Sequence, residues 1–374
     1  MGEDLKEKIK QIARGLGIDL IGFTSAAPFN ELEKIFLERK AQGYLSGFEE
    51  QDIAKRIDPR LTLENAETII VIGMSYYTDA SEICEEEGAA RGTIARSAWG
   101  KDYHEVLRNK LLILMKKIEE LIGFFQYRIF VDTGPLSDRA VARRAGLGWI
   151  GKNNMLITRQ YGSWVFIGYG IVDFKIEQDE PLQDSCAGCN ACIQACPAGA
   201  LEEGYKLKGK KCLSFITQTK DEIESEECKK LGNRIYGCDT CQLVCPHNQK
   251  IKKTKTWEFL PDPSISRPKL VDLLSMDNQT FKEKYENTAA GWRGKNTLRR
   301  NAIIALANSR DPKGIPYLEK LLAEDSKMIR KYALRGIVSL EPQAAKNILK
   351  THLKRERDAE LKGFIENFLG DDCN

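Results

Sequence analysis

The sequence contains no long hydrophobic run. A membrane-spanning helix needs about 18 or more consecutive apolar residues, and no such stretch occurs in the 374 residues. The first ten residues are charged and follow a helical pattern, so they lack the apolar core of a secretory signal. We therefore expect a cytoplasmic protein without a membrane segment.

A large charge imbalance is also missing, and histidine is scarce. Lys and Arg total 57 against 54 Asp and Glu, so the net charge of +3 says little about partners. A local excess lies between residues 250 and 300, where twelve basic residues stand against six acidic ones. Only three His are present.

The length suffices for two or three domains with a sizeable core.

Cysteine, in contrast, is abundant and regularly spaced. Residues 186–197 read Cys-x-x-Cys-x-x-Cys-x-x-x-Cys-Pro, the spacing with which bacterial ferredoxins bind 4Fe–4S clusters. Residues 238–246 read Cys-x-x-Cys-x-x-x-Cys-Pro, which lacks one Cys, and Cys212 upstream can replace it. In ferredoxins the Cys before Pro ligates the other cluster. The spacing therefore predicts two 4Fe–4S clusters held by eight thiolates.

Each cluster is assigned four ligands on this basis. We expect the first cluster to be bound by Cys186, Cys189, Cys192 and Cys245. We expect the second to be bound by Cys196, Cys212, Cys238 and Cys241. Zinc usually takes two Cys-x-x-Cys pairs per ion, and disulfides need an oxidising compartment, so both alternatives explain the spacing less well. Cys84 and Cys373 lie outside the pattern and are expected to be plain thiols.

Residues 1–180 alternate between helical and strand-like patterns. The expected helices and strands lie over 4–16 (helix), 19–23 (strand), 68–74 (strand), 103–121 (helix), 127–131 (strand), 137–145 (helix) and 164–172 (strand). This alternation predicts a multidomain chain of mixed class, α/β or α+β, that begins with an α/β domain. Residues 181–250 are predicted to form a ferredoxin-like domain, in which metal sites take the place of a hydrophobic core.

Residues 251–374 are predicted to be a basic linker followed by helical repeats. The segment from 250 to 268 is polar, basic and punctuated by Pro. Residues 298–306 resemble residues 329–337 at an offset of 31, and a Pro-initiated helix over 311–322 lies between them. The pattern is typical of HEAT-like repeats, with an ordinary helical bundle as the alternative.

Residues 146–151 spell Gly-x-Gly-x-x-Gly, the letters of a dinucleotide-binding fingerprint. That fingerprint should follow a strand and open a helix, whereas this one follows a helical run. We expect these glycines to permit close approach of the backbone to some other large ligand instead.

Asp132 lies directly after the apolar strand predicted at 127–131. Strand ends in α/β sheets point toward the ligand crevice, and an acid there can be desolvated until its raised pKa allows it to donate a proton. The alternative is that Asp132 caps the next helix, a role for which Ser137 is better placed. Nearby, residues 96–104 mix aromatic and titratable groups, which suits either a ligand wall or an ordinary helix start.

Several of these stretches resemble the epoxyqueuosine reductases. The resemblance lies in residues 96–104, 131–135, 145–152, the first Cys run, 211–214 and 233–246. It covers about residues 5–250 together with the helical tail. The run around Cys238 is specific, because a ferredoxin requires none of its non-cysteine residues. The chain departs from the family at Ser97-Ala98-Trp99, where a Tyr-Ala-hydrophobic run is more usual.

The resemblance implies an enzyme that reduces epoxyqueuosine to queuosine at the wobble position of transfer RNA, the last step of queuosine biosynthesis. It implies cobalamin bound between the α/β and ferredoxin-like domains, electron flow through both clusters to cobalt, and Asp132 as the proton donor. The cobalamin contacts that it suggests are Arg56, Arg96, Tyr103, Asp132, Lys152, Ser214, Gln218, Asp239 and Thr240. His104 lies in a sequence close to a cobalt-ligating motif, but Leu107 replaces the glycine, so no His ligand to cobalt is expected.

The expected partners are an anticodon stem-loop and an external donor such as flavodoxin or ferredoxin, with the enzyme as a monomer. The predicted RNA contacts are Lys252, Lys253, Lys255, Arg293, Lys295, Arg299, Arg300, Arg330 and Lys331. They come from the basic segment and from matching positions of two repeat helices, and the alternative for each is a solvated helix face. Two other functions are weighed. A ferredoxin-type carrier would leave the α/β domain without a role, and related reductive dehalogenases usually carry an export signal.

Overall fold

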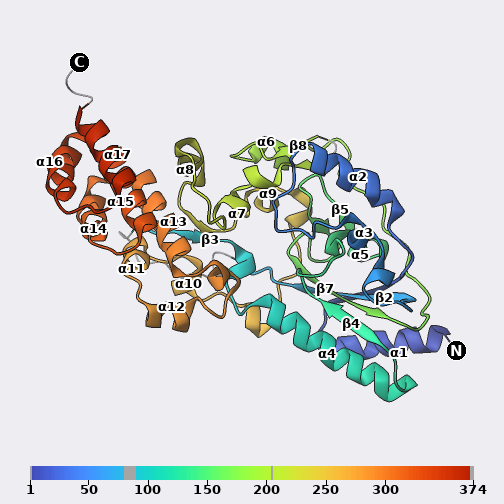
Figure 1. The fold of residues 1–374 in the computed structure, drawn as a ribbon. Helices are drawn as coiled ribbons and strands as arrows, with labels where there is room; N and C mark the ends of the chain where they lie inside the picture. The colour runs from blue at the N-terminus through green and yellow to red at the C-terminus, as the bar shows by residue number, and fades with distance from the viewer. Residues whose placement is uncertain (1, 80–89, 204, 371–374) are drawn as a thin grey trace. The chain divides into compact units, whose positions relative to one another are not determined.

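The computed structural model describes residues 2–79, 90–203 and 205–370 (Figure 1). Their contacts divide the chain into two compact units, each assembled from three stretches of sequence. The first unit comprises residues 1–83, 99–215 and 239–261. The second unit comprises residues 84–98, 216–238 and 262–374.

A four-stranded sheet forms the centre of the first unit. Its order is β1 (Leu20–Ser25), β2 (Thr68–Ser75), β7 (Val165–Val172) and β4 (Tyr127–Phe130), and every neighbouring pair is antiparallel. β2 is buried along its whole length, as its β-branched, apolar sequence predicts. Because side chains alternate along a strand, β2 contributes to two cores, one on each face of the sheet.

Helices cover both faces of this sheet. α1 (Gly2–Gly15) and the 20-residue α4 (Tyr103–Ile122) pack with one face, and α5 (Asp138–Arg144) packs with the other (Figure 1). The helices and strands expected in this part of the sequence are all present, and the mixed class is confirmed. The sheet is antiparallel, however, so the crevice rule for parallel sheets does not explain the position of Asp132.

Shorter elements of the first unit carry the Cys runs. They are α2 (Asn30–Ala41), α3 (Ile53–Ile57), the hairpin β5 (Trp149–Ile150) and β6 (Leu156–Ile157), α6 (Ala191–Ala195), the hairpin β8 (Leu201–Glu202) and β9 (Lys206–Leu207), α7 (Leu213–Ile216) and α9 (Thr240–Leu243). α6 packs on α9, which brings the two Cys runs into contact. The 3₁₀ turn η6 (Trp257–Phe259) buries Phe259 in the main core, so the predicted linker is packed here.

The three glycines of residues 146–151 make room for the protein's own backbone. A Cβ atom on Gly148 would lie 2.2 Å from the carbonyl oxygen of Ile157, and one on Gly151 would lie 2.4 Å from the Ile157 side chain. Gly146 has a φ of +75°, and its Cβ would lie 2.7 Å from the Glu180 carbonyl oxygen. Close packing within the protein is therefore sufficient to explain these glycines, and their approach to a large ligand stays a prediction.

The second unit consists mainly of paired helices. They are α8 (Ser225–Leu231), α10 (Pro263–Ser266), α11 (Leu270–Leu274), α12 (Asn278–Lys284), α13 (Lys295–Asn308), α14 (Ile315–Leu321), α15 (Lys327–Leu340), α16 (Pro342–Leu353) and α17 (Ala359–Gly370). From α13 to α17 the helices pack on their neighbours in a stack (Figure 1). The two similar sequence stretches lie in α13 and α15. A short parallel pair, β3 (Thr93–Ile94) and β10 (Arg234–Tyr236), lies beside α13. No helix in the described part of the chain has the length and apolar character to cross a membrane.

Candidate iron–sulfur centre and active site

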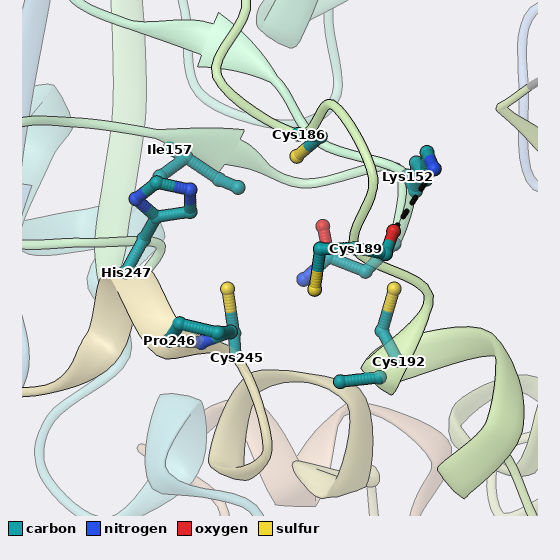
Figure 2. Close-up of a pocket in the computed structure, with 10 residues that line it drawn as sticks. Lys152, Ile157, Cys186, Cys189, Cys192, Cys245, Pro246 and His247 are labelled. Atoms are coloured by element: carbon teal, nitrogen blue, oxygen red, sulfur yellow. Dashed lines mark hydrogen bonds between the residues drawn. The ribbon is translucent and has the colours of Figure 1, made fainter.

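Four Cys side chains line one pocket in the first unit. The pocket is formed by Cys186, Cys189, Cys192 and Cys245 together with Lys152, Asn153, Ile157, Ala191, Pro246 and His247. Figure 2 shows the four sulfur atoms directed toward a common space. Tight turns present them, since the Cys189 N–H donates to the Cys186 carbonyl and the Cys245 N–H to the Gln242 carbonyl. The structure thus brings together the four residues assigned to the first cluster.

The lining of this pocket fits an iron–sulfur cluster. Asn153 is only 5% exposed, and its Nδ2 has no hydrogen-bond partner, while its Oδ1 accepts the Met155 N–H at 3.2 Å. Trp149 is buried beside Cys186 and Cys245, and its Nε1 also has no partner. Buried N–H donors beside four thiolates suit the anionic sulfur of a cluster.

Lys152 ties the β5–β6 hairpin to the Cys run. Its Nζ donates to the Cys189 carbonyl at 2.9 Å (Figure 2). It also donates to Asn190 Oδ1 at 2.8 Å. The side chain therefore lies at the cluster pocket, where sequence reasoning had placed a cobalamin contact. The structure gives Lys152 a positioning role for the cluster loop, and its contact with cobalamin stays a prediction.

Three of the four residues assigned to the second cluster lie in the first unit. Cys196 ends α6 and its Sγ accepts the Ala200 N–H at 3.3 Å, Cys212 precedes α7, and Cys241 lies in α9. Cys238 belongs to the stretch of the second unit that ends at that residue. The assignment of this second set stays a prediction. Cys84 and Cys373 lie outside the described residues.

The sequence pattern assigned no role to Cys228, because this residue lies in neither Cys run. It belongs to α8, and its Sγ donates to the Ile223 carbonyl oxygen at 3.7 Å. Burial raises the pKa of this thiol to about 11. Cys228 is therefore a neutral thiol that packs within the second unit.

A second constellation in the first unit surrounds Asp132. This residue has a φ of +58°, a left-handed conformation that is uncommon outside glycine, and its N–H donates to Asp138 Oδ2 at 3.0 Å. The Tyr103 hydroxyl donates to Asp132 Oδ2 at 2.9 Å, and His104 Nε2 lies 3.6 Å from the same oxygen. Asp102 caps α4 and holds His104 Nδ1 at 2.7 Å. The first turn of α4 therefore directs a phenol and an imidazole at the Asp132 carboxylate.

The charges in this network differ from the expectation for Asp132. Hydrogen bonds from His104 and Tyr103 outweigh the effect of burial and hold the pKa of Asp132 below its usual range. Burial alone would lower the pKa of His104, but its hydrogen bonds to Asp102 and Asp132 raise it to about 9. The predicted rise for Asp132 is therefore wrong: near neutral pH it is an anion paired with a protonated imidazole. Burial and the Asp132 charge raise the pKa of Asp138 to about 7.

The alternative role of Asp132 as a helix cap can also be judged. Ser137 occupies the N-cap position of α5, as the sequence suggested, although its hydroxyl makes no capping hydrogen bond. Asp132 does not cap the helix; its backbone N–H donates instead to the carboxylate of Asp138, the first residue of that helix. The exposed fraction of the Asp132 side chain is 65%, so it remains accessible to a reactant.

The other suggested cobalamin contacts are divided between the units. Those in the first unit are Arg56 on α3, Tyr103, Lys152, Ser214 on α7, and Asp239 and Thr240 at the start of α9. The Arg56 guanidinium lies 3.8 Å from the centre of the Phe36 ring. Arg96 and Gln218 belong to the second unit, where Gln218 accepts the Trp292 indole N–H at 2.9 Å. These cobalamin contacts stay predictions.

The structure corrects four of the predicted RNA contacts. Arg299 is 4% exposed and Arg300 is fully buried. Arg299 donates to the Leu274 carbonyl and to Glu324, and Arg300 donates to backbone carbonyls of residues 216–219. They face inward because α13 closes over helix ends whose carbonyl groups need donors.

The matching pair in the next repeat is also engaged in ion pairs. Arg330 binds both oxygens of Glu356, whose side chain is completely buried. Lys331 pairs with Glu222 and Glu360. Lys252, Lys253 and Lys255 are exposed, while Arg293 and Lys295 are half-buried, and their RNA contacts stay predictions.

We call the pocket formed by Cys186, Cys189, Cys192 and Cys245 the Cys cage. The fold and the Cys cage together define a class of iron–sulfur proteins. In this class a mixed α/β domain is combined with a double-cluster segment and helical repeats. Matches to family models agree with this class. Residues 185–248 match "4Fe-4S double cluster binding domain" and residues 294–367 match "HEAT repeats". Residues 56–133 match "Epoxyqueuosine reductase QueG, DUF1730".

Similar proteins identify the family. The chain is 41% identical over 361 residues to the epoxyqueuosine reductase of Bacillus cereus, covering 96% of this chain and 95% of the relative. It is similar to an epoxyqueuosine reductase crystallised with an epoxyqueuosine-modified tRNA-Tyr stem loop, with a TM-score of 0.94, 41% identity and 99% of both chains covered. The Bacillus subtilis enzyme, solved with its catalytic aspartate loop swung out of the active site, gives a TM-score of 0.94 at 40% identity and 99% coverage of both chains. The chain belongs to the epoxyqueuosine reductase family.

Proposed function

We propose that this protein reduces epoxyqueuosine to queuosine at the wobble position of transfer RNA, as the last step of queuosine biosynthesis. The similarity to epoxyqueuosine reductases over nearly the whole of both chains carries this proposal, since it includes a relative bound to a modified stem loop. The Cys cage and the acid network supply the electron-transfer and proton-transfer groups that the reaction needs.

The cofactors are two 4Fe–4S clusters and cobalamin. When bound, the clusters supply electrons one at a time and cobalamin supplies a strongly reducing cobalt for the epoxide. The first unit offers a suitable surface: α9 begins with Thr240, a suggested contact, and exposes Leu243 beside the Cys245 end of the cage. Both ring nitrogens of His104 face carboxylates, which supports cobalamin binding without a His ligand on cobalt.

We propose that Asp132 lies next to the epoxide oxygen of the substrate and delivers a proton to it. Loss of this oxygen as water consumes two electrons and two protons, so the site must hold protons as well as position an acid. Both contacts of Asp132 fall on Oδ2, where Tyr103 and His104 converge. A proton passes from His104 Nε2 to the Asp132 carboxylate and from there to the oxygen. The catalytic aspartate loop of the Bacillus subtilis relative supports this role for Asp132.

The partners and organisation of the enzyme complete the proposal. An external flavodoxin or ferredoxin delivers electrons, and the enzyme acts as a cytoplasmic monomer. Along the sequence, the proposal divides the chain by role into an α/β segment (1–180), a double-cluster segment (181–250), and a basic linker with HEAT-like repeats (251–374), although the two compact units combine parts of these segments. The family matches at 56–133, 185–248 and 294–367 support this division.

Anaerobic turnover tests the function directly. The protein is reconstituted with iron, sulfide and cobalamin, reduced, and incubated with a stem loop that carries epoxyqueuosine. Mass analysis of the digested nucleosides should show loss of one oxygen atom, and omission of cobalamin should abolish that loss. An unchanged nucleoside in the presence of both intact clusters and bound, reduced cobalamin would refute the proposal.

A further inference from the structure

Two of the five Trp side chains are exposed, and one of them lies on the first unit. Trp99, Trp149 and Trp164 are buried, whereas Trp257 is 65% exposed. Leu260, three residues further on, is also exposed. Neighbouring apolar side chains left in water can form a patch of the kind that marks a binding surface.

The backbone that carries the Trp257 ring is anchored to the first unit. Within η6, the Glu258 carbonyl accepts the Lys101 N–H at 2.8 Å, and Gly100 packs so closely that a Cβ there would lie 2.2 Å from the same carbonyl oxygen. Phe259 is buried in the main core. Because this backbone is already ordered, a ligand that stacks on the ring would need to order only the Trp257 side chain.

Aromatic packing connects this turn to the catalytic acid. Phe259 makes an edge contact with Phe166 at a ring separation of 5.0 Å, and Phe166 stacks with Tyr103 at 4.2 Å and an interplanar angle of 4°. Tyr103 in turn donates its hydroxyl hydrogen to Asp132. Continuous packing within the first unit therefore links the turn that carries Trp257 to Asp132.

One basic group lies at the ring, and three more lie on the preceding segment. The Lys101 ammonium lies 4.5 Å from the centre of the Trp257 ring, and Lys252, Lys253 and Lys255 are exposed on the segment that leads to it. The nearby acids are Glu258 and Asp79, of which Asp79 lies 3.9 Å from Lys253. An aromatic stacking surface combined with nearby basic groups is the arrangement by which proteins bind unpaired nucleotides.

We propose that Trp257 is a stacking platform for an unpaired base of the substrate RNA, with Lys101 beside the adjacent phosphate. This inference rests on the proposed function and names a contact that positions the loop next to Asp132. Single-stranded loops are the parts of RNA whose bases are free to stack on aromatic side chains. The platform is a positioning element, because it touches a flanking nucleotide and leaves the chemistry to Asp132.

Binding of an RNA stem loop to the reconstituted enzyme tests the platform. Replacement of Trp257 by Leu should weaken binding about tenfold, since stacking on an aromatic ring typically contributes that much or more. Trp257→Phe should retain most of the affinity. Phe124→Leu is the matched control, because Phe124 is 83% exposed elsewhere on the first unit and should have no effect.

The results of this experiment distinguish failure of the stacking platform from failure of the proposed function. If the wild-type enzyme fails to bind or reduce the stem loop, the proposed function fails. If it binds and turns over but Trp257→Leu binds equally well, only the platform is overturned. Equal weakening of a fully paired duplex would also overturn it, because a duplex offers no unpaired base.

Discussion

The Asp132 carboxylate acquires its chemistry from residues that are distant in sequence. Its position after a strand was visible in the sequence, but its charge was not, because the pKa depends on Tyr103, His104 and Asp138. The Cys spacing, in contrast, predicted which four thiols share a pocket, since ferredoxin ligation is encoded by local spacing. Asn153 could not be found in this way, because only the folded hairpin brings its amide to the cage.

Replacement of Asp132 by Asn tests the proton-delivery role. The variant should keep both clusters, cobalamin and RNA affinity, and lose turnover by about 10²–10⁴-fold, the usual worth of a placed acid–base group. Single-turnover rates on the modified stem loop measure this loss. A rate within a few-fold of the wild type would remove Asp132 from the mechanism.

The pH dependence of turnover should report His104. In the proposal His104 must be protonated, and its pKa is raised to about 9, so the single-turnover rate should stay level through neutral pH and fall as the pH rises past about 9. The groups that face it are Asp102, Asp132 and Tyr103. In His104→Gln the rate should be lower, and this alkaline limb should be absent. The same limb in the variant would assign the titration to another group.

The unpaired amide of Asn153 should affect the potential of one cluster. A donor to cluster sulfur stabilises the reduced, more negative state, so Asn153→Leu should make the midpoint potential of the first cluster more negative. A tenfold change in the ratio of reduced to oxidised cluster corresponds to about 59 mV. Redox titration followed by EPR measures both clusters, and the second is the internal control. Unchanged potentials would show that the amide does not reach the cluster.

At the scale of helices, α13 and α15 show where sequence patterns mislead. Their periodicity and their 31-residue offset correctly predicted repeated helices. The basic pairs at their starts were assigned to RNA, because a sequence does not reveal which polar side chains turn inward. In the structure Arg299, Arg300 and Arg330 satisfy buried carbonyls and a buried carboxylate, so they stabilise the stack.

Arg330 should therefore matter for stability. Glu356 is fully buried beside it, so Arg330→Met removes its guanidinium partner and leaves the carboxylate only His352 and the N–H groups of Arg357 and Asp358. This loss should cost about 3 kcal/mol of unfolding free energy. Thermal and denaturant unfolding followed by circular dichroism measures this cost. Adding Glu356→Gln should restore part of the lost stability, as expected for a coupled pair. RNA affinity at low temperature should be unchanged in both variants, and a selective loss of RNA binding in Arg330→Met would return this residue to the RNA surface.

At the scale of the whole chain, stretches of the two units alternate along the sequence, so deletion is a poor probe. Removal of the chain beyond about residue 269 would take away α13, whose Arg300 and Asn301 bind carbonyls of residues 216–219 and Ile235. The retained part of the second unit would then lose its core. Sequence reasoning treated the tail as separable because linear order suggests three consecutive domains, whereas the contacts join distant stretches.

Charge substitution on the intact chain tests the RNA surface instead. Lys252, Lys253 and Lys255 are exposed, and if each neutralises one phosphate, replacing all three by Gln should reduce the slope of log K against log salt by about 2–3. Affinity should fall at low salt and converge with the wild type at high salt, because counterion release drives the contact. The same substitutions at Lys116, Lys117 and Lys175, also exposed on the first unit, should leave the slope unchanged. Equal slopes for both triple variants and the wild type would place the phosphate contacts elsewhere on the molecule.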